Sequence, residues 1–164
     1  MNILEMQKVN EIVNTFTQVC QDCFLTGSYR FNRASKDSDI DIAFPIMAKA
    51  PLIEYLAKIN VTELEHSHYN AGVKFHLATV DQIINAVFLH PLDFVCWYIA
   101  ANMLNASNIP LNNMARHDFH ALHQIMISLP KMMIRDCVTS TNYKEFMSDM
   151  KNGQKNIVDD DTFN

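Results

Sequence analysis

Two acidic residues, Asp39 and Asp41, stand one residue apart in an apolar segment, and a Gly27-Ser28 pair precedes them. Because the side chains of a β-strand alternate between its two faces, both carboxylates project to one face. Hard oxygen ligands of this kind suit a divalent cation. A Gly-Ser turn after an apolar run is typical of a strand-to-helix turn that directs backbone N–H groups and a hydroxyl at a phosphate. The block therefore predicts phosphoryl-group chemistry on a nucleotide.

The connector between this turn and the carboxylates carries three cations, Arg30, Arg33 and Lys36. Two interpretations stay open for them. The three side chains form a solvated connector, or they bind the phosphates and balance the charge of a triphosphate beside the metal.

The composition sets bounds on the class of protein. The chain has 164 residues, of which 49% are hydrophobic and 19% charged, so it is long enough to bury a substantial core. No segment approaches the roughly 18 apolar residues that span a bilayer, and no signal-peptide pattern is present, so we expect a cytoplasmic protein without a membrane partner. A formal net charge of −5 argues against a broad surface for duplex DNA. A single Cys20-x-x-Cys23 pair predicts structural thiols rather than a zinc site.

Hydrophobic periodicity predicts the elements that position these residues. In the first part of the chain we expect a helix at 3–20, strands at 23–25 and 39–44, helical turns at 28–33, a helix at 51–59, and a hairpin of 61–69 with 73–80 around a turn at 70–72. The apolar run at 81–87 fits a strand or a helix. Later segments predict helices at 92–105, at 111–129 ending at Pro130, and at 143–150. The fold class is thus α/β, with a small mixed twisted sheet in residues 1–90, a C-terminal helical bundle in 91–150 packed on it, and a poorly ordered polar tail in 151–164.

The block of Gly27-Ser28, a spacer, and Asp39-Ile40-Asp41 resembles the polymerase-beta-type nucleotidyltransferase superfamily, and the small size is similar to its minimal members. The resemblance implies nucleotidyltransferase topology and transfer of a nucleoside monophosphate from a nucleoside triphosphate, such as ATP, to a hydroxyl, with release of pyrophosphate. Gly27 and Ser28 would hold the phosphates, and Asp39 and Asp41 would coordinate two Mg²⁺ or Mn²⁺ ions. The acceptor is left open among an RNA end, a protein hydroxyl and a small molecule.

A looser similarity to small phage-encoded members, which would work in the host cytoplasm, extends the match along the chain. It covers Asn85-Ala86-Val87, Phe94, Trp97, Ala100-Ala101, Leu104, Arg116 and Phe119. It implies that Asn85 and Arg116 contact the nucleotide. In the family a third carboxylate on a neighbouring strand completes the metal site and helps to activate the acceptor. Either Asp81 supplies this acid or the site is incomplete, because the amide of Asn85 is a poor metal ligand and no base.

An incomplete site favours an alternative function. The chain would then be a catalytically weakened relative, antitoxin-like or defence-modulating, that binds a nucleotide or a protein partner. Two other patterns have plainer explanations. His117, His120 and His123 recur on one predicted helix, where a solvated or packed face outweighs a metal site, and the Arg116 to His123 spacing is similar to that of HEPN-type ribonucleases, a short and common motif. Trp97-Tyr98 suits core packing better than stacking on a base.

Overall fold

The computed structural model of the chain describes residues 5–67 and 72–160, with side chains up to Gly153. A five-stranded sheet with the strand order β1-β2-β5-β4-β3 forms its centre. The strands are β1 (Phe24–Thr26), β2 (Ile40–Pro45), β3 (Glu65–His66), β4 (Val73–Leu77) and β5 (Gln82–Leu89). β2 and β5 run parallel, whereas the other neighbours run antiparallel. The predicted α/β class with a mixed sheet is confirmed.

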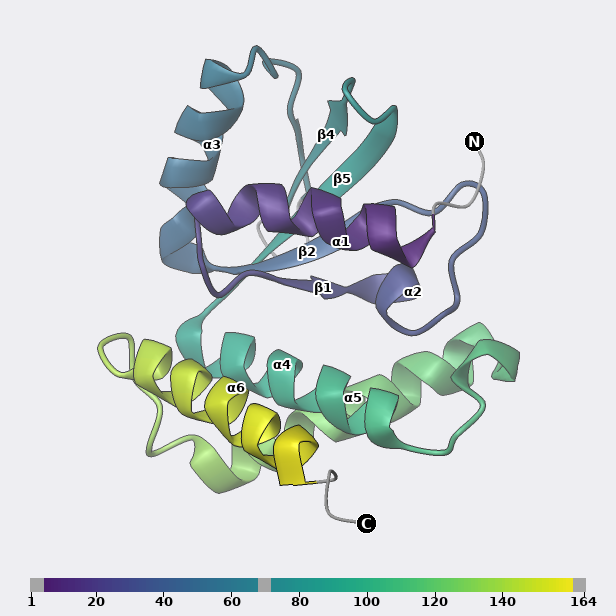
Figure 1. The fold of residues 1–164 in the computed structure, drawn as a ribbon, viewed down its shortest axis with the longest axis vertical. Coiled ribbons are helices and arrows are strands. Elements are labelled where there is room, and N and C mark those ends of the chain that lie inside the picture. The colour runs from purple at the N-terminus through teal and green to yellow at the C-terminus, as the bar shows by residue number, and fades with distance from the viewer. Residues whose placement is uncertain (1–4, 68–71, 161–164) are drawn as a thin grey trace.

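Helices cover both faces of this sheet (Figure 1). They are α1 (Met6–Thr15), α2 (Gly27–Arg30), α3 (Lys49–Lys58), α4 (Pro91–Ala106), α5 (Arg116–Ile134) and α6 (Tyr143–Asp160), with short 3-10 helices η1 (Phe16–Gln18), η2 (Ile46–Ala48) and η3 (Leu111–Asn113). α1 and α3 lie on one side of the sheet, and α4, α5 and α6 form a layer on the other. The C-terminal helices therefore pack against the face opposite to α1.

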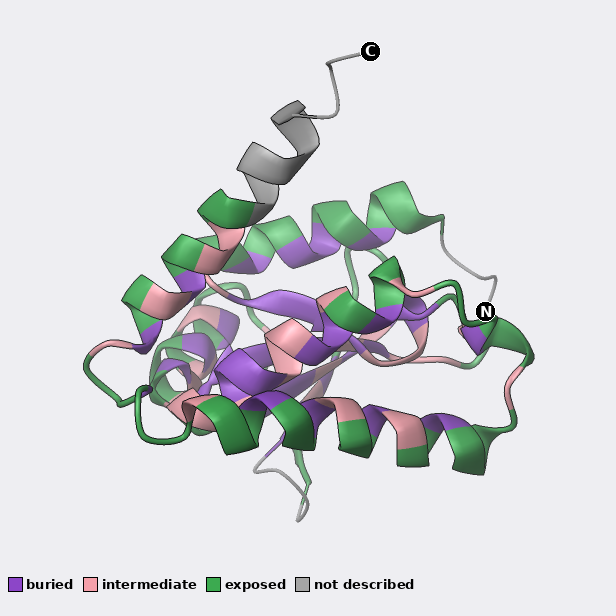
Figure 2. Cartoon of the chain, turned by 90° about the horizontal axis from the view of Figure 1, so that it is seen from below, coloured by how far each residue is buried: buried purple, intermediate pink, exposed green. Residues whose placement is uncertain are grey.

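The alternation of β2 divides its side chains between these two layers. Ile40, Ile42 and Phe44 point into the core beneath α1 and α3. Ala43 points the other way and packs in the cluster that α4 and α6 contribute to. The helices accordingly bury their inner sides against the sheet and expose their outer ones (Figure 2). Asp41 alternates with Ile40 and Ile42, so it shares the face of Ala43.

The structure resolves the ambiguous segment and corrects one helix end. Residues 81–87 lie mostly in β5, so the strand interpretation was right. Pro130 does not end its helix, because α5 continues to Ile134. The fixed φ of proline is compatible with a helix, and the Pro130 ring is buried.

Other differences concern the ends of elements. α6 extends to Asp160, well into the segment that was predicted as a polar tail. The predicted hairpin is present as the antiparallel pair β3 and β4. Its expected turn at 70–71 lies outside the described residues, as do the predicted helix start at residue 3 and the end of the tail at 161–164. Of the helices in residues 5–67 and 72–160, none has the length and apolar character required to cross a membrane.

Candidate functional site

A row of polar side chains crosses the sheet at one level. Thr26 of β1 is in register with Asp41 of β2, and Asp41 is in register with Asn85 of β5. Asn85 is in turn paired with Lys74 of β4. Because register partners present their side chains on the same face, the row faces the C-terminal helices. Asp41 and Asn85, which the sequence placed 44 positions apart, are joined by a hydrogen bond of 2.7 Å.

Gly27 brings the turn at the end of β1 against Asp41. Its φ is +65°, in the left-handed region that favours glycine. A Cβ added at Gly27 would lie 2.6 Å from the carboxyl carbon of Asp41 and closer still to Oδ2. Glycine is therefore required at position 27 both by its positive φ and by its close contact with Asp41. The predicted Gly27-Ser28 turn and the predicted Asp41 are brought together.

The carboxyl group of Asp41 lies in a partly dehydrated environment. Burial raises its pKa to about 6, and the neighbouring charge of Asp39 acts in the same direction. The hydrogen bond that the Asn85 amide donates, and the positive charge of Lys74, lower the pKa against this trend. Ionisation of Asp41 is thus less favourable than that of a carboxyl group in water.

Asp39 has a different partner. The ammonium group of Lys74 lies 2.7 Å from Asp39 Oδ2, and both side chains are partly exposed. The hydrogen bond to Asp39 raises the pKa of Lys74, which keeps the ammonium charged at neutral pH. Lys74 was not a predicted site residue. The alternation of Val73, Phe75 and Leu77 does place it on the polar face of its strand, but the register that carries it to Asp39 is a long-range property.

A cleft of about 980 Å³ opens between this end of the sheet and helix α5. Thr26, Gly27, Ser28, Asp39, Asp41 and Asn85 line its sheet side. Trp97, Arg116, Phe119, His120 and His123 line its helical side. The volume is at the upper end of the roughly 300–1,000 Å³ that is usual for small-molecule sites. Most of the predicted site residues therefore share one cavity with an aromatic wall.

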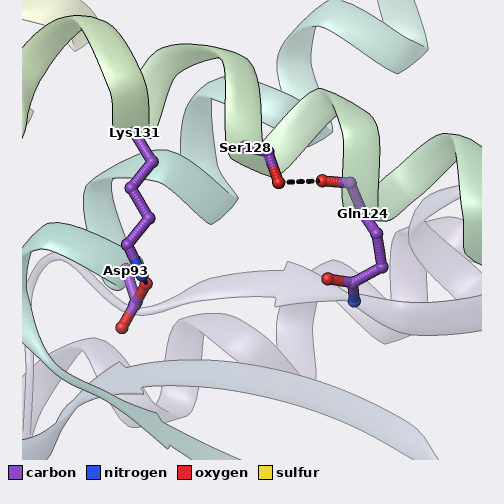
Figure 3. A network of polar contacts seen from close by, with 4 residues as sticks. All are labelled: Asp93, Gln124, Ser128 and Lys131. Atoms are coloured by element: carbon purple, nitrogen blue, oxygen red, sulfur yellow. Dashed lines mark hydrogen bonds and ion pairs between the residues drawn. The ribbon is translucent and has the colours of Figure 1, made fainter.

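Polar groups that the sequence did not single out also line the cleft. Lys131 of α5 forms a 2.5 Å ion pair with Asp93 of α4, and Gln124 and Ser128 lie on the same stretch of α5 (Figure 3). The Ser128 hydroxyl donates a 2.8 Å hydrogen bond to the backbone carbonyl of Gln124. Sequence patterns alone do not identify these residues, because only the packing of α4 and α5 on the sheet brings them to the cleft.

The predicted phosphate-binding cations separate into two groups. Arg33 and Arg116 line the cleft. The Arg33 guanidinium lies 4.7 Å from the ring centre of Phe119 and donates to the carbonyl of Leu111, so its position is fixed. Arg116 is exposed, and its Nε donates to His120 at 3.4 Å rather than pairing with His123.

Arg30 and Lys36 are not among the described residues of the cleft wall, and their predicted binding of phosphate stays a prediction. Arg30 donates to the side chain of Asn102 at 2.7 Å, and Asn105, with its amide oriented to satisfy both atoms, accepts from Arg30 Nε at 3.1 Å. Arg30 therefore links α2 to α4, because a partly buried guanidinium requires nearby acceptors. Lys36 is exposed.

The structure does not bring Asp81 to the carboxylate pair, so its assignment as the third acid is wrong. Asp81 occupies the turn between β4 and β5 with φ 51°, and its carboxylate lies 2.9 Å from His76 Nε2. Its side chain is 86% exposed. Asn85 is four residues further along, about 13 Å away at the usual rise of a strand. Asn85, and not Asp81, is thus the residue beside Asp41 on the neighbouring strand.

These donors fit one divalent cation. Asp39 and Asp41 supply hard carboxylate oxygens to one cleft, and burial of Asp41 disfavours its ionised form, which a bound cation would stabilise. In the part of the chain that the structure describes, no three His, Cys, Asp or Glu side chains form a group that could hold a metal. The pair of ions that the family resemblance implies therefore lacks its full set of acidic ligands within these residues.

The remaining sequence patterns have structural roles. His123 is buried against Phe119 and Trp97, and its Nε2 has no hydrogen-bond partner among the described residues. Tyr98 packs on Phe24, whereas Trp97 reaches the cleft wall. Cys23 is buried, and burial raises its pKa to about 12, so its thiol is inert at neutral pH.

Comparison with known proteins gives structural likeness alone. Neither a family model nor a curated protein matches this chain. The Cid1 poly(U) polymerase is similar with a TM-score of 0.43 and 14% identity over 65% of this chain and 36% of that one. A cytoplasmic RNA terminal U-transferase is similar with a TM-score of 0.39 and 16% identity over 55% of this chain and 29% of that one. The match thus spans about a third of the length of these structures.

Proposed function

We propose that the chain is a metal-dependent nucleotidyltransferase, which moves a nucleoside monophosphate from a nucleoside triphosphate to a hydroxyl acceptor and releases pyrophosphate. One observation carries the proposal. The backbone of Gly27 lies directly against the carboxylate of Asp41, inside a cleft of about 980 Å³. A phosphate held by the Gly27-Ser28 turn would therefore meet the carboxylate pair without any movement of the sheet.

The residues of the cleft would divide the work of binding the donor. Gly27 and Ser28 open α2, where the first backbone N–H groups have no acceptor within the helix and suit a phosphate oxygen. Arg33, fixed over the ring of Phe119, and Arg116 would bind further phosphate charge. A divalent cation held by Asp39 and Asp41 would neutralise charge on the phosphates and lower the pKa of the acceptor hydroxyl.

The stretch of α5 from Gln124 to Lys131 is the proposed acceptor side of the cleft. It lines the same cavity as the phosphate turn and the carboxylates, which belong to the sheet side. The side chains of Gln124 and Ser128 offer donors and acceptors, which suit a polar acceptor. The cleft therefore has room for a donor and for part of an acceptor.

A second candidate function follows from Asn85. This residue is in register with Asp41, and its amide donates to that carboxylate. An amide takes up no proton at neutral pH, so it could not activate a hydroxyl as a carboxylate would. The same cleft would then bind a nucleotide and present it, or itself, to a protein partner without turnover.

The test compares the wild-type protein with a double variant, Asp39→Ala with Asp41→Ala. Each protein is incubated with Mg²⁺ and each of the four α-labelled nucleoside triphosphates, together with an RNA oligonucleotide, a protein mixture and a small-molecule extract as acceptors. We expect label in one acceptor and release of pyrophosphate from the wild type, and neither from the double variant. Tight binding of a nucleotide without transfer would favour the second candidate. Absence of both binding and transfer would refute the proposal.

A further inference from the structure

Lys74 occupies a place beside the carboxylate pair that its strand alone does not explain. It is the register partner of Asn85, which is itself the register partner of Asp41. The side chain extends along this row, and its ammonium group lies 2.7 Å from Asp39 Oδ2. A positive charge is thus held at the site by the sheet itself.

The charges around Lys74 come from three residues. Asp39 accepts the hydrogen bond of Lys74, and Asp41 of β2 adds a second negative charge on the same side. Glu65 of β3, the register partner of Lys74, adds a third from the opposite side. Asn85, between Lys74 and Asp41, carries no charge. The positive charge of Lys74 is therefore surrounded by carboxylates on both sides.

Two nitrogen donors occupy half of the carboxylate oxygens of the pair. Lys74 holds Asp39 Oδ2, and Asn85 donates to Asp41 Oδ1 at 2.7 Å. Among the contacts of the described residues, this leaves Asp39 Oδ1 and Asp41 Oδ2, and the latter is the oxygen nearest to Gly27. Two oxygens are the usual protein share of one Mg²⁺ ion, whose other ligands are waters and phosphate oxygens. A second ion would have to share these two oxygens or compete with Lys74 and Asn85 for the other two.

We infer that the ammonium group of Lys74 takes the place of one metal ion, so that the Asp39 and Asp41 pair binds a single divalent cation. The inference rests on the proposed function for the nucleotide that this cation would accompany. Lys74 is a positioning residue here, because it limits and orients the carboxylates and touches no reacting atom. Removal of its charge should release Asp39 Oδ2 and make the pair a stronger cation site.

The experiment measures binding of Mn²⁺ alone, by the loss of the free-ion signal in electron paramagnetic resonance. The variants are Lys74→Met, which removes the charge, Lys74→Arg, which keeps it, and Lys58→Met, which removes an exposed lysine of α3 as a matched control. Asp41→Asn locates the site. Thermal melts establish that each variant is folded, and Lys74→Gln replaces Lys74→Met if the latter does not melt cooperatively.

We expect one Mn²⁺ per wild-type chain, with the same affinity in Lys74→Arg and Lys58→Met and little binding in Asp41→Asn. Lys74→Met should bind Mn²⁺ about tenfold more tightly and take up a second ion. Two ions per wild-type chain, no binding to the wild type, or an affinity of Lys74→Met within twofold of the wild type would overturn the inference. Since no nucleotide is present, failure of nucleotidyl transfer would not alter this measurement.

Discussion

Asn85 Nδ2 donates a 2.7 Å hydrogen bond to Asp41 Oδ1 across the parallel pair of β2 and β5. The bond satisfies a carboxylate that burial has partly deprived of water, and it lowers the pKa of Asp41 against the effect of that burial. A neutral amide thereby occupies the position from which a third acid could reach the same cation. The arrangement stabilises the carboxylate pair without adding to its charge.

Replacement of Asn85 by aspartate should make the protein dependent on a divalent cation. Asn85→Asp removes the donor to Asp41 and adds a negative charge, which costs about 1–2 kcal/mol because Lys74 offsets part of the repulsion. At roughly 2–4 °C per kcal/mol, the melting temperature falls by about 2–8 °C without metal. Mg²⁺ should restore it.

Asn85→Ala is the matched control for this change. It loses the same hydrogen bond without creating a third carboxylate, so its melting temperature should fall by a similar amount and respond to Mg²⁺ no more than the wild type does. An Asn85→Asp protein that melts at the same temperature with and without Mg²⁺ would show that residue 85 does not face the cation.

The part of the site that the sequence predicted is the part with local causes. Asp39 and Asp41 share a face because strand side chains alternate, and Gly27 has a positive φ because the chain turns sharply after β1. The fold class followed in the same way, from apolar periodicity along each segment. These features need no knowledge of which strands are neighbours.

The other assignments depended on contacts between distant segments. Asp81 and Asn85 were both candidates for the face beside Asp41, and only the register of β5 on β2 distinguishes them. Arg30 was predicted to bind phosphate, but packing of α4 brings Asn102 within 2.7 Å of it. Lys74 was missed because it reaches its partner Asp39, just before β2, across the intervening strand β5.

Substitution of Gly27 should damage the site more than the fold. In Gly27→Ala the left-handed backbone costs about 1–2 kcal/mol, and the new methyl group must displace the carboxylate of Asp41. Binding of a fluorescent nucleoside triphosphate, measured by anisotropy, should weaken at least tenfold. Gly153→Ala is the control, because nothing lies within 4 Å of its added Cβ in α6. That variant should bind nucleotide normally and gain about 0.5–1 kcal/mol of stability.

The two groups of cations should respond differently to substitution. Arg30→Met removes the link between α2 and Asn102 and leaves a partly buried amide without its charged donor, so the free energy of unfolding should fall by about 1–3 kcal/mol. Arg116→Met, at an exposed position on the cleft wall, should leave stability within about 0.5 kcal/mol of the wild type and weaken nucleotide binding severalfold. Urea denaturation and nucleotide titration of both variants make the comparison. A stable Arg30→Met protein with weakened nucleotide binding would support the sequence-based prediction.

His123 should make the protein sensitive to acid. Burial, with a smaller contribution from His120, lowers its pKa from 6.5 to about 4. Above pH 6.5 the imidazole is neutral in the folded and the unfolded chain, so protonation does not affect the free energy of unfolding. As the pH falls from 6.5 to about 4, the unfolded chain takes up a proton that the folded chain excludes, so stability falls by about 1.4 kcal/mol per pH unit, or about 3 kcal/mol in total.

His123→Phe should remove this part of the pH dependence, because a phenyl ring packs on Phe119 and carries no proton. The exposed His117→Gln serves as the control. Urea denaturation at pH 7.5, 6, 5 and 4 measures the slopes, and a wild-type slope that His123→Phe leaves unchanged would place the acid sensitivity elsewhere.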